Sequence, residues 1–182
     1  STASDFIGIN GTKTSDLAFG GRVDPSPITA TGKTELWNGT NWTEQNDLST
    51  ARHGLAGTGV DNTSALGFGG NTPTTGATEE WTGAGAAVGA WSTGGNLNTA
   101  RYGMGGLGIY TAALSVGGRN PGASDGVGNT ESYDGTSWTE VNDLSTARHS
   151  LMTSATSSTA ALAFGGEDTA RLAVTETWNG TN

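Results

Sequence analysis

Apolar residues in this chain occur in short runs, separated by clusters of turn-forming residues. Between residues 53 and 93, runs at 53–60, 65–69 and 78–82 and a fourth around Trp91 are rich in small, β-branched and aromatic residues. Asp61-Asn62-Thr63 and a longer polar segment at 71–77 separate these runs. Short runs bounded by turn residues are typical of strands. No stretch shows the spacing of an amphipathic helix, so the pattern predicts an all-β protein.

The same pattern recurs along the whole chain. Gly-Gly pairs begin at Gly20, Gly69, Gly117 and Gly165, which are 49, 48 and 48 residues apart. A Thr-Glu-X-aromatic motif ends at Trp37, Trp81, Tyr133 and Trp178. A further tryptophan follows in the first three copies only, at Trp42, Trp91 and Trp138. A fixed period of this length indicates a repeat protein in which each copy is one supersecondary unit.

Each copy is expected to form one four-stranded antiparallel blade. Asn38-Gly39 and Asp134-Gly135 join the third and fourth strands, and such dipeptides favour tight hairpin turns. Four strands in about 48 residues without a helix are typical of a propeller blade. We place the blades at residues 1–48, 49–97, 98–144 and 145–182. The fourth blade is expected to lack its outer strand.

These units resemble kelch repeats. The kelch pattern combines an apolar run ending in Gly-Gly, an aromatic residue on the third strand, a tryptophan on the fourth, and a basic residue before the next blade. Phe68-Gly69-Gly70 with Trp81, Trp91 and Arg101 fits it, as do the first and third copies. The chain is also similar to kelch-like arrays predicted in tailed-phage and environmental proteins. The resemblance implies a β-propeller and favours a virion or extracellular setting.

How the ring closes is left open by the sequence. The chain is expected to be a piece of a longer array with six to eight blades, one half of a ring formed by two chains, or a four-bladed ring. The outer edge beside Val174 and Trp178 is expected to be unpaired. Such an edge is a site for strand addition by another chain.

Composition and charge narrow the partners. The net charge is −9, with 8 Lys and Arg against 17 acidic residues, which argues against nucleic acid. The sequence contains no Cys, so it lacks the cysteine that galactose oxidase, a kelch-type enzyme, needs for its copper site. No apolar run is long enough for a membrane-spanning helix. We expect no cofactor, no metal and no membrane partner.

The arginines are the candidate binding residues. All six fall in loops between second and third strands or at junctions between blades, which share one face: Arg22, Arg52, Arg101, Arg119, Arg148 and Arg171. Arg52, Arg101 and Arg148 occupy one repeat position and are expected to pair with a repeated acid such as Asp47 or Asp143. Arg22, Arg119 and Arg171 vary more in placement and are better candidates for binding a carboxylate or an acidic sugar.

Other conspicuous residues are expected to be structural. His53 and His149 share one repeat position at the start of a blade, on different blades. Four glutamates share a position on the third strand, where a neighbouring arginine or backbone would bind them: Glu35, Glu79, Glu131 and Glu176. The tryptophans are expected to fill the space between blades.

The sequence therefore predicts a non-catalytic module that presents variable loops to a protein or glycan, as a phage structural or host-attachment component would. An alternative is a propeller enzyme, of lyase or glycoside hydrolase type, with Asp24, Asp125 and Asp168 as candidate acids. A third interpretation is an assembly module, a homodimer or larger, that pairs through its open blade edge.

Overall fold

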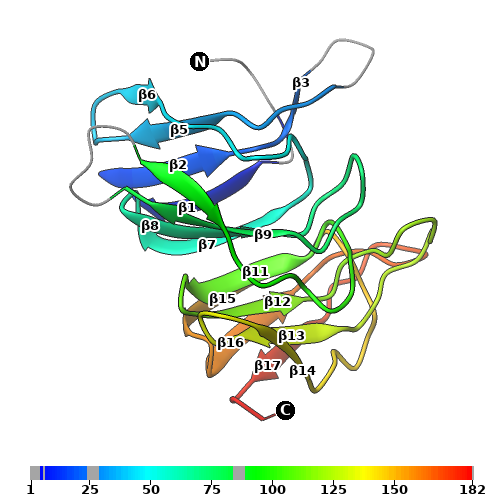
Figure 1. Ribbon diagram of the computed structural model, residues 1–182. Coiled ribbons are helices and arrows are strands. Elements are labelled where there is room, and N and C mark those ends of the chain that lie inside the picture. The colour runs from blue at the N-terminus through cyan, green and yellow to red at the C-terminus, as the bar shows by residue number, and fades with distance from the viewer. Residues whose placement is uncertain (1–4, 6, 24–28, 84–88, 182) are drawn as a thin grey trace.

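The structure, a computed structural model, describes residue 5 and residues 7–23, 29–83 and 89–181. The described part is all β and forms four blades arranged as a β-propeller, as predicted (Figure 1). It contains no helix long and apolar enough to cross a membrane.

Each blade is an antiparallel sheet whose strands follow one another in chain order. The first blade consists of β1 (Gly8–Thr12), β2 (Ser15–Phe19), β5 (Thr34–Trp37) and β6 (Trp42–Glu44). The second consists of β7 (Ala56–Asp61), β8 (Ser64–Phe68), β9 (Thr78–Thr82) and β10 (Ala90–Thr93). The third consists of β11 (Gly105–Ile109), β12 (Ala112–Val116), β13 (Thr130–Tyr133) and β14 (Trp138–Val141). The fourth has three strands, β15 (Met152–Ser157), β16 (Ala160–Phe164) and β17 (Thr175–Trp178).

Two local details differ from the sequence-based expectation. In the second blade the first strand begins at Ala56 rather than at His53, because Gly54 has a φ of +64° and His53 forms only an isolated bridge to Asn71. The loop after β2 also contains a small hairpin, β3 (Arg22–Val23) and β4 (Thr29–Ala30), which the apolar pattern did not indicate.

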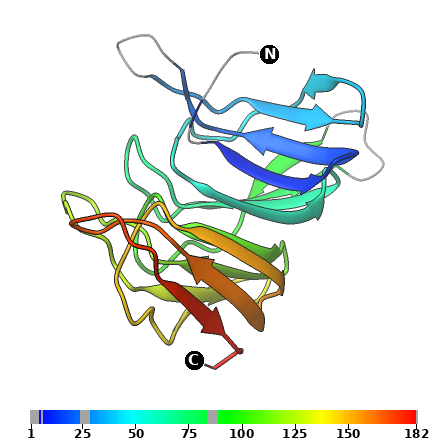
Figure 2. The ribbon, with the colours of Figure 1, turned by 180° about the vertical axis from the view of Figure 1, so that it is seen from behind.

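The first strands of the blades are the inner strands. β7 packs between β1 and β11, and β11 in turn packs against β15. The first and fourth blades lie at opposite ends of the molecule in both views (Figures 1 and 2). The faces at these ends are more exposed than the faces between blades: Phe164 is 38% exposed, whereas its counterpart Phe68 is fully buried. Met152 beside it is 65% exposed.

The Gly-Gly pairs join each blade to the next. The N–H of Gly118 donates to the carbonyl of Arg148 at 3.0 Å, and Gly21 and Gly70 donate in the same way to Arg52 and Arg101. Gly117 has a φ of +63°, and a Cβ there would lie 2.5 Å from the Arg148 carbonyl oxygen. This close backbone approach explains why glycine recurs at the position.

The core lies between blades and combines leucine and alanine side chains with aromatic rings. The Trp91 ring packs edge-on against Phe19 with centroids 4.8 Å apart, and Trp138 packs against Phe68 at 4.8 Å. Trp81 and Trp138 are almost fully buried, whereas Trp42 on the first blade is 41% exposed. Thin sheets with glycine and alanine on their faces leave wedge-shaped gaps, and these rings fill them.

Candidate binding site at the axial pocket

Two repeat positions meet where the inner strands begin. One follows the buried arginine directly, and the other follows the Gly-Gly pair. In every blade the two positions form an isolated antiparallel bridge: Asp5 with Arg22, His53 with Asn71, Tyr102 with Arg119, and His149 with Glu167. The combination of the two residue types differs from blade to blade, although the backbone arrangement repeats.

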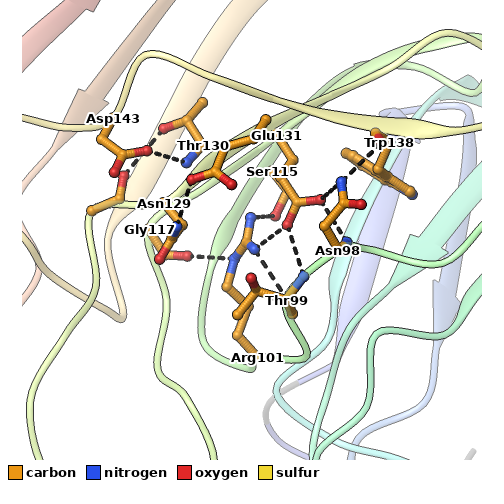
Figure 3. Close-up of polar contacts among 12 residues, drawn as sticks. Asn98, Thr99, Arg101, Ser115, Gly117, Asn129, Thr130, Glu131, Trp138 and Asp143 are labelled. Atoms are coloured by element: carbon orange, nitrogen blue, oxygen red, sulfur yellow. Dashed lines mark hydrogen bonds and ion pairs between the residues drawn. The ribbon is translucent and has the colours of Figure 1, made fainter.

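Next to these positions in the sequence are buried arginines that form ion pairs, and Figure 3 shows the one in the third blade. Arg101 forms an ion pair with Glu131, and both side chains are at most 1% exposed. Arg101 Nε also donates to the Gly117 carbonyl at 2.9 Å, and Nη2 donates to Ser115 Oγ at 3.0 Å. The second carboxylate oxygen of Glu131 accepts hydrogen bonds from Asn98 N at 2.7 Å and Nδ2 at 2.9 Å. The network fixes the start of the third blade.

The same pair recurs in the neighbouring blades. Arg52 Nη1 lies 2.8 Å from Glu79 Oε1, and Arg148 forms an ion pair with Glu176. The partner of each arginine is therefore the strand glutamate, not Asp47 or Asp143 as the sequence suggested. Asp47 and Asp143 instead accept the backbone N–H groups of the residues that open β5 and β13, at 3.3 and 3.2 Å.

Burial removes these three arginines from contact with a ligand. The exposed fractions of Arg52, Arg101 and Arg148 are 1%, 0% and 0%. They therefore fix the neighbouring segments instead, although they were among the candidate binding residues.

At the bridged positions lies a cavity of about 270 Å³, which we call the axial pocket. All four blades contribute to its lining, which is formed by Arg22, His53, Gly54, Tyr102, Gly103, Arg119, His149, Ser150 and Glu167. Backbone hydrogen bonds of 2.7 Å join Gly103 to Gly54 and Ser150 to Gly103. The floor of the pocket is therefore rigid, and the side chains around it vary.

The two arginines of the pocket differ in how their charge is balanced. Arg22 forms a two-point contact with the Asp5 carboxylate, at 2.8 and 3.1 Å. Arg119 donates through Nε and Nη2 to one neutral acceptor, the Ser124 carbonyl. Among the described residues no carboxylate forms an ion pair with Arg119, so it is the stronger anchor for an anion.

Both histidines line this pocket, each from its own blade as expected, although we expected their role to be structural. Burial lowers the pKa of His149, and the positive charge of Arg119 lowers it further. Burial and Arg22 lower the pKa of His53 in the same way. Both imidazoles are therefore neutral at pH 7 and can donate and accept hydrogen bonds. His149 Nδ1 lies 3.0 Å from Ser150 Oγ, and Nε2 lies 3.8 Å from Glu167.

The remaining candidates lie outside the pocket lining. Arg171 is exposed and bridges to Glu167 within the same loop. Asp168 accepts the Gly126 N–H at 2.8 Å and so joins the loops of the third and fourth blades. Asp125 is exposed beside Ser124, and Asp24 lies outside the described residues. Within the described ranges, no three His, Asp or Glu side chains are grouped so as to hold a metal ion.

The fold and the pocket together define a β-propeller array with a polar pocket where the inner strands begin. No protein-family model matches the chain, and no curated protein matches it.

Proposed function

We propose that this chain is a non-catalytic, kelch-like recognition module that binds the carboxylate-bearing sugar of a glycan in the axial pocket. The observation that carries the proposal is the contrast between constant and variable positions. Four copies share the glycine pairs, and three share the buried arginine, whereas the combination of residues at the two bridged positions of the pocket differs from copy to copy. Variable side chains on a rigid repeated scaffold are typical of binding surfaces.

The chemistry of the lining favours an acidic sugar. Arg119 offers a guanidinium that matches a carboxylate in shape and charge. Tyr102 and the histidine rings can pack against a sugar ring, and Glu167 can accept its hydroxyl groups. The cavity of about 270 Å³ is small compared with ligand pockets of about 300–1,000 Å³, which suits one sugar residue or one side chain. Recognition of a surface glycan fits a host-attachment role.

A catalytic role has less support among the described residues. The buried acids Glu79 and Glu131 are each paired with an arginine, so neither resembles a free general acid or base. The candidate acids Asp125 and Asp168 lie in loops outside the pocket lining. The enzyme alternative predicts turnover of a bound saccharide, which chromatography of the incubated ligand would detect.

A glycan array that includes uronic acid and sialic acid termini tests the proposal. We expect binding to acidic saccharides and not to their neutral counterparts, such as galacturonate compared with galactose. Arg119→Gln should weaken binding about 10- to 100-fold, since a hydrogen bond between charged groups contributes about 1.5–3 kcal/mol. Arg171→Gln is the matched control, because Arg171 lies outside the pocket, and should bind as the parent does.

Two results would count against this function. If Arg119→Gln bound acidic sugars as well as Arg171→Gln, the pocket would not be the site. If no acidic saccharide bound and an acidic peptide did, the ligand would be a protein.

A further inference from the structure

The axial pocket holds two side chains of opposite charge that are not paired with each other. Arg119 enters from the third blade and Glu167 from the fourth. A backbone hydrogen bond of 2.7 Å from Ser150 to Gly103 joins these two blades at the pocket. Among the described residues, no ion pair joins Arg119 to a carboxylate, and none joins Glu167 to a lysine or an arginine. One cation and one anion are therefore left for a ligand.

The other ionisable groups at the pocket are balanced or neutral at pH 7. The Asp5 carboxylate holds Arg22 at two points. His149 is neutral, and its Nε2 lies 3.8 Å from Glu167, beyond hydrogen-bond distance. Burial and Arg119 lower the pKa of His149 whereas Glu167 raises it, so the imidazole lies within reach of both unpaired charges. The pocket thus has a positive side at Arg119 and a negative side at Glu167.

The unpaired carboxylate limits which acidic sugar the pocket accepts. Arg119 attracts a carboxylate, but Glu167 repels any negative charge that enters the same cavity, and placing like charges together weakens binding. The whole chain has a net charge of −9, so a purely anionic glycan also approaches against its field. A ligand with one carboxylate and one ammonium group is complementary to both side chains and carries no net charge against this field.

We infer that the axial pocket selects a hexuronic acid with a free amine at C2, with the carboxylate on Arg119 and the ammonium group on Glu167. In such a sugar C2 lies across the pyranose ring from C5, which carries the carboxylate. The ring therefore holds the two charges apart, and each can reach its own partner. The cavity of about 270 Å³ has room for one such ring. This inference rests on the proposed function and narrows the ligand from acidic sugars to zwitterionic ones.

Calorimetry with three methyl glycosides at pH 7 tests the role of the amine. The ligands are those of galacturonic acid, of 2-amino-2-deoxygalacturonic acid, whose amine is mostly protonated at this pH, and of its N-acetyl derivative. The amino sugar should bind about 3- to 10-fold more tightly than galacturonate, a modest gain because the Glu167 side chain is 47% exposed. The N-acetyl derivative keeps the carboxylate and lacks the positive charge, so it should show no gain.

A pair of matched variants assigns the gain to one carboxylate. Glu167→Gln removes the negative charge and keeps the shape, so the affinity ratio of the amino sugar to galacturonate should fall to about 1. Galacturonate itself should bind this variant about 2- to 5-fold more tightly, because the repulsion is lost. Glu140→Gln is the control, because Glu140 is an exposed acid on β14 outside the pocket lining, and it should keep the ratio of the parent. A general loss of structure would weaken both sugars and leave their ratio unchanged.

The His149 imidazole gives a second readout that does not depend on affinity. The negative charge of Glu167 raises its pKa, and a bound ammonium group cancels part of that charge. NMR titration of the complexes should therefore show a smaller rise of the His149 pKa with the amino sugar than with galacturonate.

The possible results separate this inference from the function on which it rests. The inference is wrong if galacturonate binds and the amine adds nothing, if the N-acetyl derivative gains as much, or if Glu167→Gln keeps the parent ratio. An equal rise of the His149 pKa in the two complexes also contradicts it. If neither galacturonate nor the amino sugar binds, the proposed function itself fails.

Discussion

Replacing Glu131 by Gln tests the buried ion pairs that fix the segments lining the axial pocket. The carboxylate accepts from Asn98 N and Nδ2 on one oxygen and from Arg101 Nη1 and Thr99 N on the other. An amide in its place would turn one N–H donor toward other donors. It would also leave the Arg101 charge without a counter-ion at 0% exposure.

Removing one partner of a buried ion pair costs about 3–5 kcal/mol. For a chain of this size, each kcal/mol corresponds to a change in Tm of about 2–4 °C, so Glu131→Gln should lower Tm by about 6–20 °C. Glu176→Gln should cost less, because the Glu176 side chain is 20% exposed and water can replace part of the lost interaction.

Thermal and urea unfolding, followed by circular dichroism, measure these losses. The matched control is Glu140→Gln, because Glu140 is exposed and lies opposite Glu131 in the strand register. That control should change the free energy of unfolding by less than about 0.5 kcal/mol. The double variant Arg101→Met, Glu131→Leu should recover most of the loss, since no unpaired charge remains. The reasoning is refuted if Glu131→Gln stays within about 1 kcal/mol of the parent or if the double variant is no better than the single one.

Three further predictions concern the blade contact, acid stability and ligand binding. Gly117→Ala should destabilise the chain by at least about 2 kcal/mol more than Gly122→Ala in urea unfolding. A Cβ at Gly117 would lie 2.5 Å from a carbonyl oxygen, whereas no atom lies within 4 Å of a Cβ at Gly122. Burial raises the pKa of Glu176, but hydrogen bonds from Ser145 and Arg148 outweigh it and leave the pKa below its usual 4.5. The unfolded state therefore takes up this proton first, so stability should fall as the pH drops below about 4.5, and less steeply in Glu176→Gln. Affinity for an acidic sugar should rise as the pH falls from 7 toward the lowered pKa of His149, since the protonated ring adds a positive charge between Arg119 and Glu167. Calorimetry from pH 7 to pH 5 measures this affinity. A fall in affinity over that range would contradict the prediction.

The blades could be predicted from the sequence because their markers are local and recur in step. The third strand of the second blade was placed at residues 78–82, where β9 lies. The three strands of the fourth blade were also predicted, and its described residues form β15, β16 and β17. Both conclusions depend only on spacing within one repeat.

The axial pocket could not be predicted in the same way. Its lining comes from residues up to 145 positions apart, Arg22 and Glu167 (167 − 22), and only the packing of inner strands brings them together. His53 and His149 looked structural because they share a repeat position, yet the residues bridged to them, Asn71 and Glu167, differ. The sequence did carry one indication of the pocket. The residue directly after the buried arginine and the residue directly after Gly-Gly vary among the copies, while the flanking residues stay nearly constant. The sequence did not single out the strand glutamates as the partners of the buried arginines, because acids recur at two positions in the repeat.

The most direct test of the central claim, that variable side chains on a constant scaffold bind an acidic sugar, is an NMR titration of the two histidine rings. The protein, with labelled imidazoles, is titrated with whichever acidic monosaccharide the array favours, and with its neutral counterpart. The account predicts saturable shifts of His53 and His149 with the acid, a raised pKa of His149 in the complex, and neither effect in Arg119→Gln. Saturable binding that leaves both imidazole signals and the pKa of His149 unchanged would contradict it.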